Sequence, residues 1–240
     1  MPNPYKYVRF CAWGGPVLLV GLIVFWGVLG SNIPPYSAAL DAQAIADHYR
    51  HHTTNIRIGM IVTMMLGVLY LVWGMAITKV MEAVEWHNDV LSRLQLWGAG
   101  FTALILVFPP AIWLAAAFRP DQLDPSIIQM LYDTGWIVFD LAFTLTALQL
   151  VAIGVCFLSD RRAVPVIPKW VSWLCLWIAF MFLMLFLMPF FKDGPFSRSG
   201  IVNYWVEFIL FFLFMQVMSL YTFRALNILE HEHAEAVKHG

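Results

Sequence analysis

Residues 136–158 read WIVFDLAFTLTALQLVAIGVCFL, a run of 23 residues in which Asp140 carries the single charge. An α-helix rises about 1.5 Å per residue, so a run of this length crosses the roughly 30 Å hydrocarbon core of a bilayer. The length and apolar content favour a transmembrane helix over a helix in the core of a soluble domain. The run also places an ionisable side chain inside the membrane, where such groups are costly and usually functional.

Five similar segments accompany this run, and together they predict an all-α, polytopic bundle of six transmembrane helices. The chain is 61% hydrophobic and 12% charged, against roughly 25% charged residues in an average soluble domain. Its mean hydropathy of +0.74 also excludes a disordered chain. Neither an internal repeat nor a Gly/Ser linker divides the sequence, so we expect residues 1–240 to form a single integral membrane domain. The predicted spans are 10–30, 58–80, 96–118, 136–158, 169–191 and 201–223.

The basic residues of the loops predict the orientation of the bundle. With the N-terminus inside, nine Lys and Arg residues lie on the inner side and five on the outer side. Cytoplasmic loops carry the excess of Lys and Arg, so both termini are expected to be cytoplasmic, in a bacterial inner membrane. The longest connection, from Ser31 to Asn55, then lies outside. Within it, Ser37 to Arg50 predicts a short amphipathic helix that lies along the membrane surface or caps the bundle.

Carboxyl groups within or beside the spans gather near the outer ends of the fourth and sixth spans. Asp133 lies seven residues before Asp140, on the same helical face. Asn203 lies four residues before Glu207 and shares a face with it. We therefore predict that Asp140, Glu207 and Asp133 are the catalytic candidates of a site in the outer leaflet.

The surroundings of these acids predict an outward-facing pocket with aromatic walls. Pro109-Pro110 should interrupt the third span near its outer end, and Pro189 should weaken the outer end of the fifth. Irregular backbone at this depth is tolerated where protein or a cavity satisfies it. The candidate substrate-binding residues are Arg57, Arg119, Trp136, Phe139, Asn203, Tyr204 and His52.

Two other interpretations of the polar residues remain open. Asp140 and Glu207 could pair with Arg57 and Arg119 and simply hold the helices together, because structural ion pairs also occupy such positions. His48-Tyr49-Arg50-His51-His52 resembles one histidine box of the membrane di-iron hydroxylases, but the chain has only seven histidines and forms no further box. A single transition-metal site on this stretch stays open, although the polar face of a surface helix explains it more simply, and we predict no metal site.

Several short sequences, spread over most of the chain, resemble a family of mostly uncharacterised bacterial six-span membrane proteins. They are Ile33–Ala38 (IPPYSA), Ile45–Arg50 (IADHYR), Asn55–Gly59 (NIRIG), Tyr132–Trp136 (YDTGW), Pro165–Trp170 (PVIPKW) and Gly194–Phe196 (GPF). In size and topology alone, the chain is also similar to membrane-bound linalool isomerase, which interconverts terpene alcohols without a cofactor. That similarity implies a terpenoid substrate and assigns a role to no individual residue.

Paired carboxyl groups without a nucleophile or a cofactor motif favour acid–base chemistry. We therefore expect a cofactor-independent enzyme that isomerises, hydrates or dehydrates a small lipophilic, terpenoid-like alcohol. The alternatives are a non-enzymatic protein that binds or transports a lipophile, and an accessory subunit of a membrane complex. The expected partners are the lipophilic substrate, membrane lipids and, as a homo-oligomer, further copies of the chain. The net charge of -1 gives no sign of nucleic-acid binding.

Overall fold

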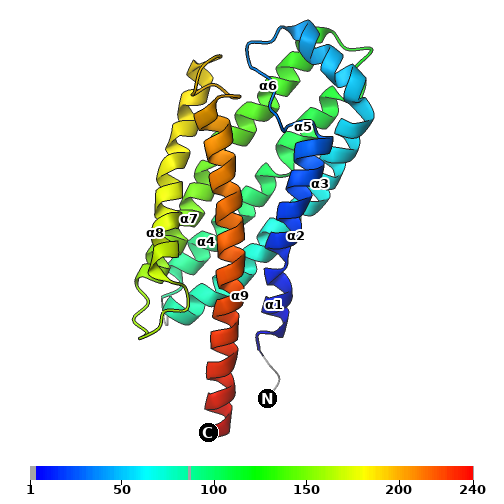
Figure 1. Ribbon diagram of the computed structural model, residues 1–240. Helices are drawn as coiled ribbons and strands as arrows, with labels where there is room; N and C mark the ends of the chain where they lie inside the picture. Colours follow the sequence, from blue (N-terminus) through cyan, green and yellow to red (C-terminus); the bar gives the residue numbers. More distant parts are fainter. Residues whose placement is uncertain (1–3, 86–87, 240) are drawn as a thin grey trace.

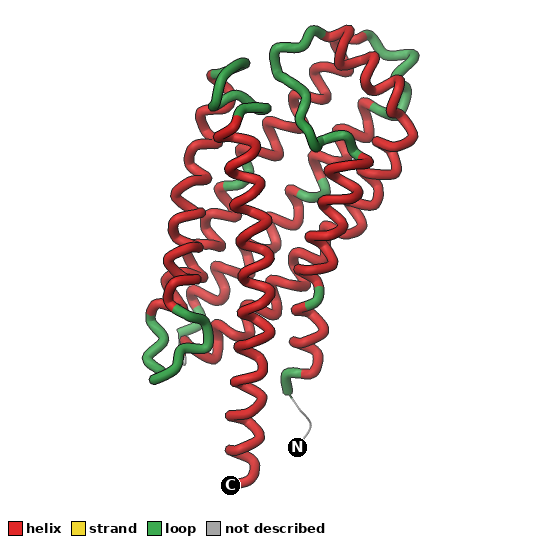
Figure 2. The backbone as a smooth tube through the Cα atoms, viewed as in Figure 1, coloured by secondary structure: helices red, strands yellow, loops and turns green. Residues whose placement is uncertain are grey.

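The computed structural model describes residues 4–85 and 88–239, and all regular structure in these ranges is helical. Six stretches are long and apolar enough to cross a membrane, which confirms the predicted all-α bundle and indicates a multi-pass membrane protein. The helices run side by side in an elongated bundle, and the first and last described residues lie toward the same end (Figures 1 and 2). We name the opposite end the outer end, following the orientation that the loop charges favour.

Most of the spans are broken into shorter helices. The first comprises α1 (Lys6–Ala12), α2 (Gly14–Gly21) and the π-helix η1 (Leu22–Leu29), and the second is α3 (Ala42–Glu85). The third comprises α4 (Val90–Ile105) and α5 (Phe108–Ala116), and the fourth α6 (Pro125–Leu141) and α7 (Thr144–Leu158). The fifth comprises α8 (Lys169–Met181) and the 3₁₀ helix η2 (Phe182–Phe190), and the sixth the π-helix η3 (Ile201–Val206) and α9 (Glu207–His239).

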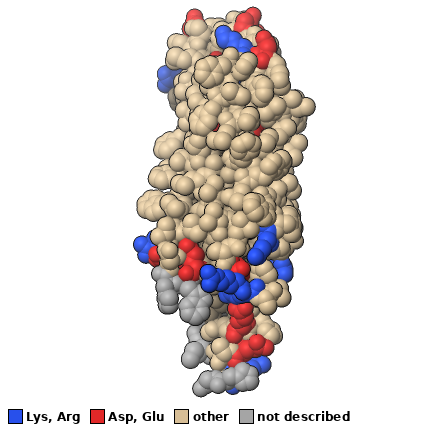
Figure 3. All heavy atoms as spheres, turned by 90° about the vertical axis from the view of Figure 1, so that its left-hand side faces the viewer, with Lys and Arg blue, Asp and Glu red and all other residues tan. Residues whose placement is uncertain are grey.

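Charged side chains gather at the two ends of the bundle. The space-filling view shows a broad middle band composed almost entirely of other residues, with Lys, Arg, Asp and Glu above and below it (Figure 3). Many large apolar side chains of the six spans are exposed, among them Met65, Val68 and Phe180. A surface of this kind suits contact with lipid tails, as the six spans require.

The outer amphipathic helix differs from the prediction. Residues 37–41 are not helical, and the helix that begins at Ala42 continues without a loop into the second span. The Asp41 carboxylate accepts a hydrogen bond from the Ala44 N–H at 2.8 Å and so starts the helix. His52 alone departs from helical geometry, with φ −111° and ψ 16°. Two helices therefore meet at a kink at His52 with no loop between them. No Pro or Gly between Ala42 and Ile58 marks this kink in the sequence.

The predicted interruption of the third span is confirmed. α4 ends at Ile105 and α5 begins at Phe108, so Pro109 and Pro110 occupy the first turn of α5. Proline is tolerated there because the N–H groups of a first turn have no partner within the helix. The predicted weakening at Pro189 is also confirmed, since that residue lies in η2, which has 3₁₀ geometry.

Buried polar contacts hold α3, α4 and α7 together. The Tyr70 hydroxyl donates to Gln149 Oε1 at 2.9 Å, and the Thr78 hydroxyl donates to Gln95 Oε1 at 2.5 Å. α4 and α7 also approach closely at Gly98, where an added Cβ would lie 2.8 Å from the Gln149 Cβ and 3.1 Å from its Cα. Small residues at such contacts let helix backbones pack tightly in membranes.

This close approach makes a matched pair of substitutions informative. Gly98→Ala should destabilise the protein by roughly 1–3 kcal/mol, because the backbone of α7 has to move. Gly100→Ala, on the same helix, meets its nearest neighbour only at 3.8 Å. It should leave stability unchanged or raise it by up to about 1 kcal/mol through better helix propensity. Thermal unfolding in detergent measures both, and equal effects would contradict the packing of α4 on α7.

Candidate functional site

Asp140 and Glu207 converge on one void in the outer half of the bundle. Asp140 lies near the end of α6 and Glu207 at the start of α9, and they are 2% and 3% exposed. Both line the same void. The other lining residues are Phe143, Phe182, Leu185 and Phe208. No water-sized sphere fits between these six side chains, so the site is closed in this structure.

The oxygens of this acid pair are poorly satisfied. Asp140 Oδ1 and both carboxyl oxygens of Glu207 are buried and have no hydrogen-bond partner within residues 4–85 and 88–239. Most buried polar groups in native proteins are hydrogen-bonded, and an exception calls for an explanation. An acid that only joined helices would be expected to have a bonded partner, whereas a site that receives a polar ligand leaves such oxygens available.

The helices around the acid pair are irregular at the same level. α6 ends one residue after Asp140, and α7 begins only at Thr144. The π-helix η3 ends immediately before Glu207, and the 3₁₀ helix η2 supplies Phe182 and Leu185 to the void. π-Helical turns are frequent at functional sites, and irregular backbone within a membrane is tolerated beside a cavity.

A cluster of aromatic rings supports the site from the first span. Trp26 of the π-helix η1 stacks on Phe208 with ring centroids 4.9 Å apart and on Phe139 at 5.5 Å. Its edge meets Trp136, and Trp136 in turn contacts Trp113 at 5.2 Å. Trp136 and Phe139, which were predicted to line the pocket, therefore pack within this cluster. The rings that line the void are those of Phe143, Phe182 and Phe208.

Arg198 is a buried basic residue of the outer end that the sequence analysis did not select. It forms an ion pair with Asp133, with 2.6 Å between Nη1 and Oδ1. The guanidinium lies over the Tyr132 ring, 4.6 Å from its centroid. The sequence signal was its position in the loop Gly194–Gly200, which joins the fifth and sixth spans. The ion pair with Asp133 places this loop beside α6 of the fourth span.

Arg57 and Arg119 occupy other places in the structure. Arg57 donates from Nε to the Ala117 carbonyl at 2.9 Å and from Nη2 to the Phe118 carbonyl at 2.7 Å, so it caps the end of α5. Arg119 lies with its guanidinium 5.2 Å from the centroid of the Phe118 ring. The pairing of Asp140 and Glu207 with these two arginines is absent from the described residues.

The remaining candidate residues lie outside the void, either in hydrogen bonds between segments or in other pockets. Asn203 donates to the Phe196 carbonyl at 2.6 Å, and the Tyr204 hydroxyl donates to the Asn32 carbonyl. Trp136 and Asp133 line a separate pocket at the outer surface. His52 lies elsewhere, in a surface pocket formed with Pro34 and Tyr36.

The rings of the histidine-rich stretch lie close together and are tilted relative to one another. His48 lies 4.1 Å from the Tyr36 ring and 5.0 Å from the His52 ring, measured between centroids. His51 Nδ1 lies 2.6 Å from the Asp47 carbonyl oxygen. Within the described residues, no group of three or more His, Cys, Asp and Glu side chains is arranged to hold a metal ion.

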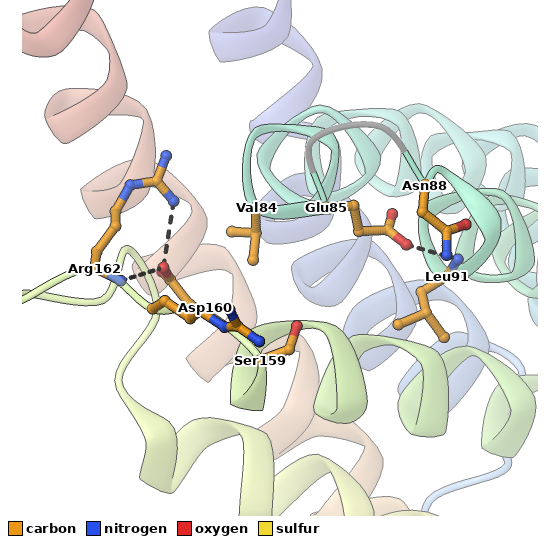
Figure 4. A pocket seen from close by; sticks show the side chains of 8 residues that line it. Val84, Glu85, Asn88, Leu91, Ser159, Asp160 and Arg162 are labelled. Atoms are coloured by element: carbon orange, nitrogen blue, oxygen red, sulfur yellow. Dashed lines mark hydrogen bonds and ion pairs between the residues drawn. The ribbon is translucent and has the colours of Figure 1, made fainter.

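A larger pocket, of about 810 Å³, lies at the opposite end of the bundle (Figure 4). Its acids are fully engaged in the local structure. Glu85 accepts hydrogen bonds from the N–H groups of Leu91 and Ser92, at 2.9 and 2.8 Å. Asp160 accepts hydrogen bonds from Arg162 and from the Val166 N–H. These groups fix two loops and leave no acid free for chemistry.

The contrast between Glu207 and Glu85 gives a testable prediction. Glu207→Met should raise the free energy of unfolding by roughly 1–3 kcal/mol, because it removes a buried polar group that has no partner. Glu85→Met should lower that free energy by a similar amount, because two backbone N–H groups lose their acceptor. Unfolding in detergent measures both variants. A Glu207 variant that unfolds as readily as the Glu85 variant would show that Glu207 is a structural residue.

No family model, curated protein or solved structure matches the chain. The resemblance to a bacterial six-span family and the similarity to linalool isomerase therefore remain predictions. The site is defined by its geometry alone: two buried acids from α6 and α9, one shared void, and irregular helices around it.

Proposed function

We propose that the chain is a cofactor-independent enzyme that performs acid–base chemistry on a small lipophilic alcohol at Asp140 and Glu207. The observation that carries the proposal is the convergence of two buried acids, with three oxygens lacking partners, on one apolar void. We also propose that it lies in a bacterial inner membrane with both termini in the cytoplasm, as the loop charges favour.

The acid pair suits this chemistry because its two members cannot easily be charged together. Like charges that share a buried site disfavour joint ionisation, so one carboxyl group keeps a proton while the other accepts one. Such a pair supplies a general acid and a general base in the same cavity. Arg198 forms an ion pair with Asp133, which lies on α6 with Asp140, whereas Glu207 lies on α9, so the two acids have different surroundings.

An allylic alcohol fits these parts. The protonated carboxyl group donates its proton to the hydroxyl oxygen as the C–O bond breaks. A water molecule departs, and the remaining substrate is an allyl cation. The ring face of Phe208 stabilises the positive charge. Water then adds at the other end of the allyl system and gives a proton to the carboxylate, which completes an isomerisation. Loss of a proton from carbon to the same carboxylate gives a dehydration instead.

The closed void requires that part of its wall move when a substrate enters. Phe182 and Leu185 are the side chains that η2 contributes. A 3₁₀ helix has poorer hydrogen-bond geometry than an α-helix and is uncommon over a run this long. We therefore propose that η2 is the segment that opens, and that a lipophile reaches the acids from the bilayer.

The same void supports a second candidate function, which is binding or transport of a lipophile without chemistry. An accessory subunit with acids facing a partner helix is less well supported. Asp140 and Glu207 are enclosed by their own bundle, so a partner chain could not reach them without the same opening.

Oxygen exchange distinguishes these functions. The purified chain in detergent is incubated with terpenoid allylic alcohols in H₂¹⁸O, and ¹⁸O incorporation is measured by mass spectrometry. This detects ionisation and recapture of water even without net isomerisation. We expect Asp140→Asn and Glu207→Gln each to lower exchange by about 10²–10⁴-fold, because each removes one partner of the acid–base pair.

The matched control is Asp124→Asn, on the same helix. Asp124 is exposed and caps α6 through the Ser126 N–H, and asparagine caps a helix equally well. The control should exchange oxygen at the rate of the unsubstituted protein. Unaltered exchange by folded Asp140→Asn and Glu207→Gln would refute the proposal, and binding of the alcohols without any exchange would favour the second candidate.

A further inference from the structure

The outer-surface pocket that Trp136 and Asp133 line has a volume of about 150 Å³. It lies where α6, the end of η2 and the loop before η3 meet. Its lining includes Asp133, Trp136, Met188, Lys192 and Arg198. The proposed acid–base chemistry uses none of these side chains directly, so it does not explain why charged groups line this pocket.

The charges of this outer pocket are unbalanced. Arg198 and Lys192 supply two positive charges, and Asp133 supplies one negative charge. The Arg198 side chain is only 4% exposed, and within the described residues its one ion pair joins Nη1 to Asp133. Its Nε is buried and has no hydrogen-bond partner in the described part of the chain, where Lys192 also forms no ion pair. The pocket therefore offers donors for one further anionic group.

Arg198 is held in place before any ligand arrives. Its guanidinium lies 4.6 Å from the Tyr132 ring centroid and 5.9 Å from the Trp136 ring centroid. The loop that carries it is fixed by the Asn203 amide, which donates to the Phe196 carbonyl, and by the Ser197 hydroxyl, which donates to the Gly194 carbonyl. A preorganised donor loses little entropy on binding, which favours ligand affinity.

The rest of the pocket is apolar. Trp136, Ile137, Met188 and Phe191 form its walls, and it borders the lipid-facing surface that includes Leu187 and Phe190. A small hydrophilic anion would leave these walls in contact with water. An apolar chain that ends in a charged head group satisfies both the walls and the two cations.

We propose that this outer pocket binds a lipophilic anion, with a singly charged carboxylate or phosphodiester head group on Arg198 and Lys192 and an apolar chain along Trp136 and Met188. The shared chemistry fits both a free fatty acid and the head group of an anionic membrane lipid. Arginine presents planar, forked donors that match either group. This site does not depend on the reaction proposed for Asp140 and Glu207.

The test measures binding of radiolabelled decanoate to the full-length chain in dodecyl maltoside, with decanol as the uncharged counterpart. A parallel arm adds phosphatidylglycerol to the micelles and follows its retention by native mass spectrometry. We expect retention of decanoate, of phosphatidylglycerol or of both, and the responding probe identifies the source of the head group. Retention of neither, or equal binding of decanoate and decanol, overturns the proposal.

The variants separate ligand binding from loop structure. Arg198→Gln should weaken binding at least about tenfold, since it removes a charge-assisted hydrogen bond. Lys192→Gln, at an exposed side chain, should weaken it less. Asp133→Asn should strengthen binding, because it frees Nη1 and removes a competing negative charge. A purely structural Arg198–Asp133 pair predicts instead that Arg198→Gln and Asp133→Asn both leave retention unchanged or lower it together.

Arg119→Gln is the matched control, since Arg119 lies at the outer end against the Phe118 ring and outside the pocket. It should bind the probes as the unsubstituted chain does. If Arg198→Gln fails to fold, the binding measured for Lys192→Gln and Asp133→Asn still tests whether the pocket binds a lipophilic anion. Weaker binding by Asp133→Asn than by the unsubstituted chain, or unchanged binding by Lys192→Gln, overturns the assignment.

Discussion

The cost of burying a carboxyl group without a partner constrains the outer half of this protein. Transfer of an unbonded polar group into an apolar site costs on the order of 1–3 kcal/mol, and an isolated charge costs far more. Asp140 and Glu207 incur this cost twice, on two helices and at one void. Natural proteins retain such unfavourable arrangements chiefly where function needs them, which favours a functional role for the acid pair.

The architecture around the acids follows from the same constraint. A regular transmembrane helix satisfies its own backbone and can pack anywhere in the bundle, whereas an interrupted helix needs neighbours that satisfy its free groups. The π-helices η1 and η3 and the 3₁₀ helix η2 all lie in the outer half, and the break between α6 and α7 follows Asp140. The inner half is built differently, with Tyr70–Gln149 and Thr78–Gln95 hydrogen bonds between continuous helices. The two halves of the bundle thus differ in the regularity of their helices.

The sequence predicts the spans well, because a long apolar run has few alternatives to a transmembrane helix. It also predicts that Asp140 and Glu207 share one depth, since helical periodicity and loop topology place both near the outer ends. The identity of the basic partner was not predictable in this way. Arg57 and Arg119 are close to the span ends in sequence, yet they bond to the carbonyls of Ala117 and Phe118 or lie on a ring. Arg198 lies in a loop whose path depends on tertiary contacts, such as the Asn203–Phe196 hydrogen bond. The packing of Trp26 against Phe139 and Phe208 likewise joins spans that no local pattern connects.

A double-mutant cycle on Asp140 and Glu207 tests the central claim most directly. The free energy of unfolding is measured for the unsubstituted chain, Asp140→Asn, Glu207→Gln and the doubly substituted protein. If the two acids share one void and one proton, replacing either acid by its amide changes the protonation of the other, so the two effects are not additive and the coupling exceeds about 0.5 kcal/mol. Additive effects within that limit would mean that the acids occupy separate environments, and the account of a shared acid–base site would be wrong.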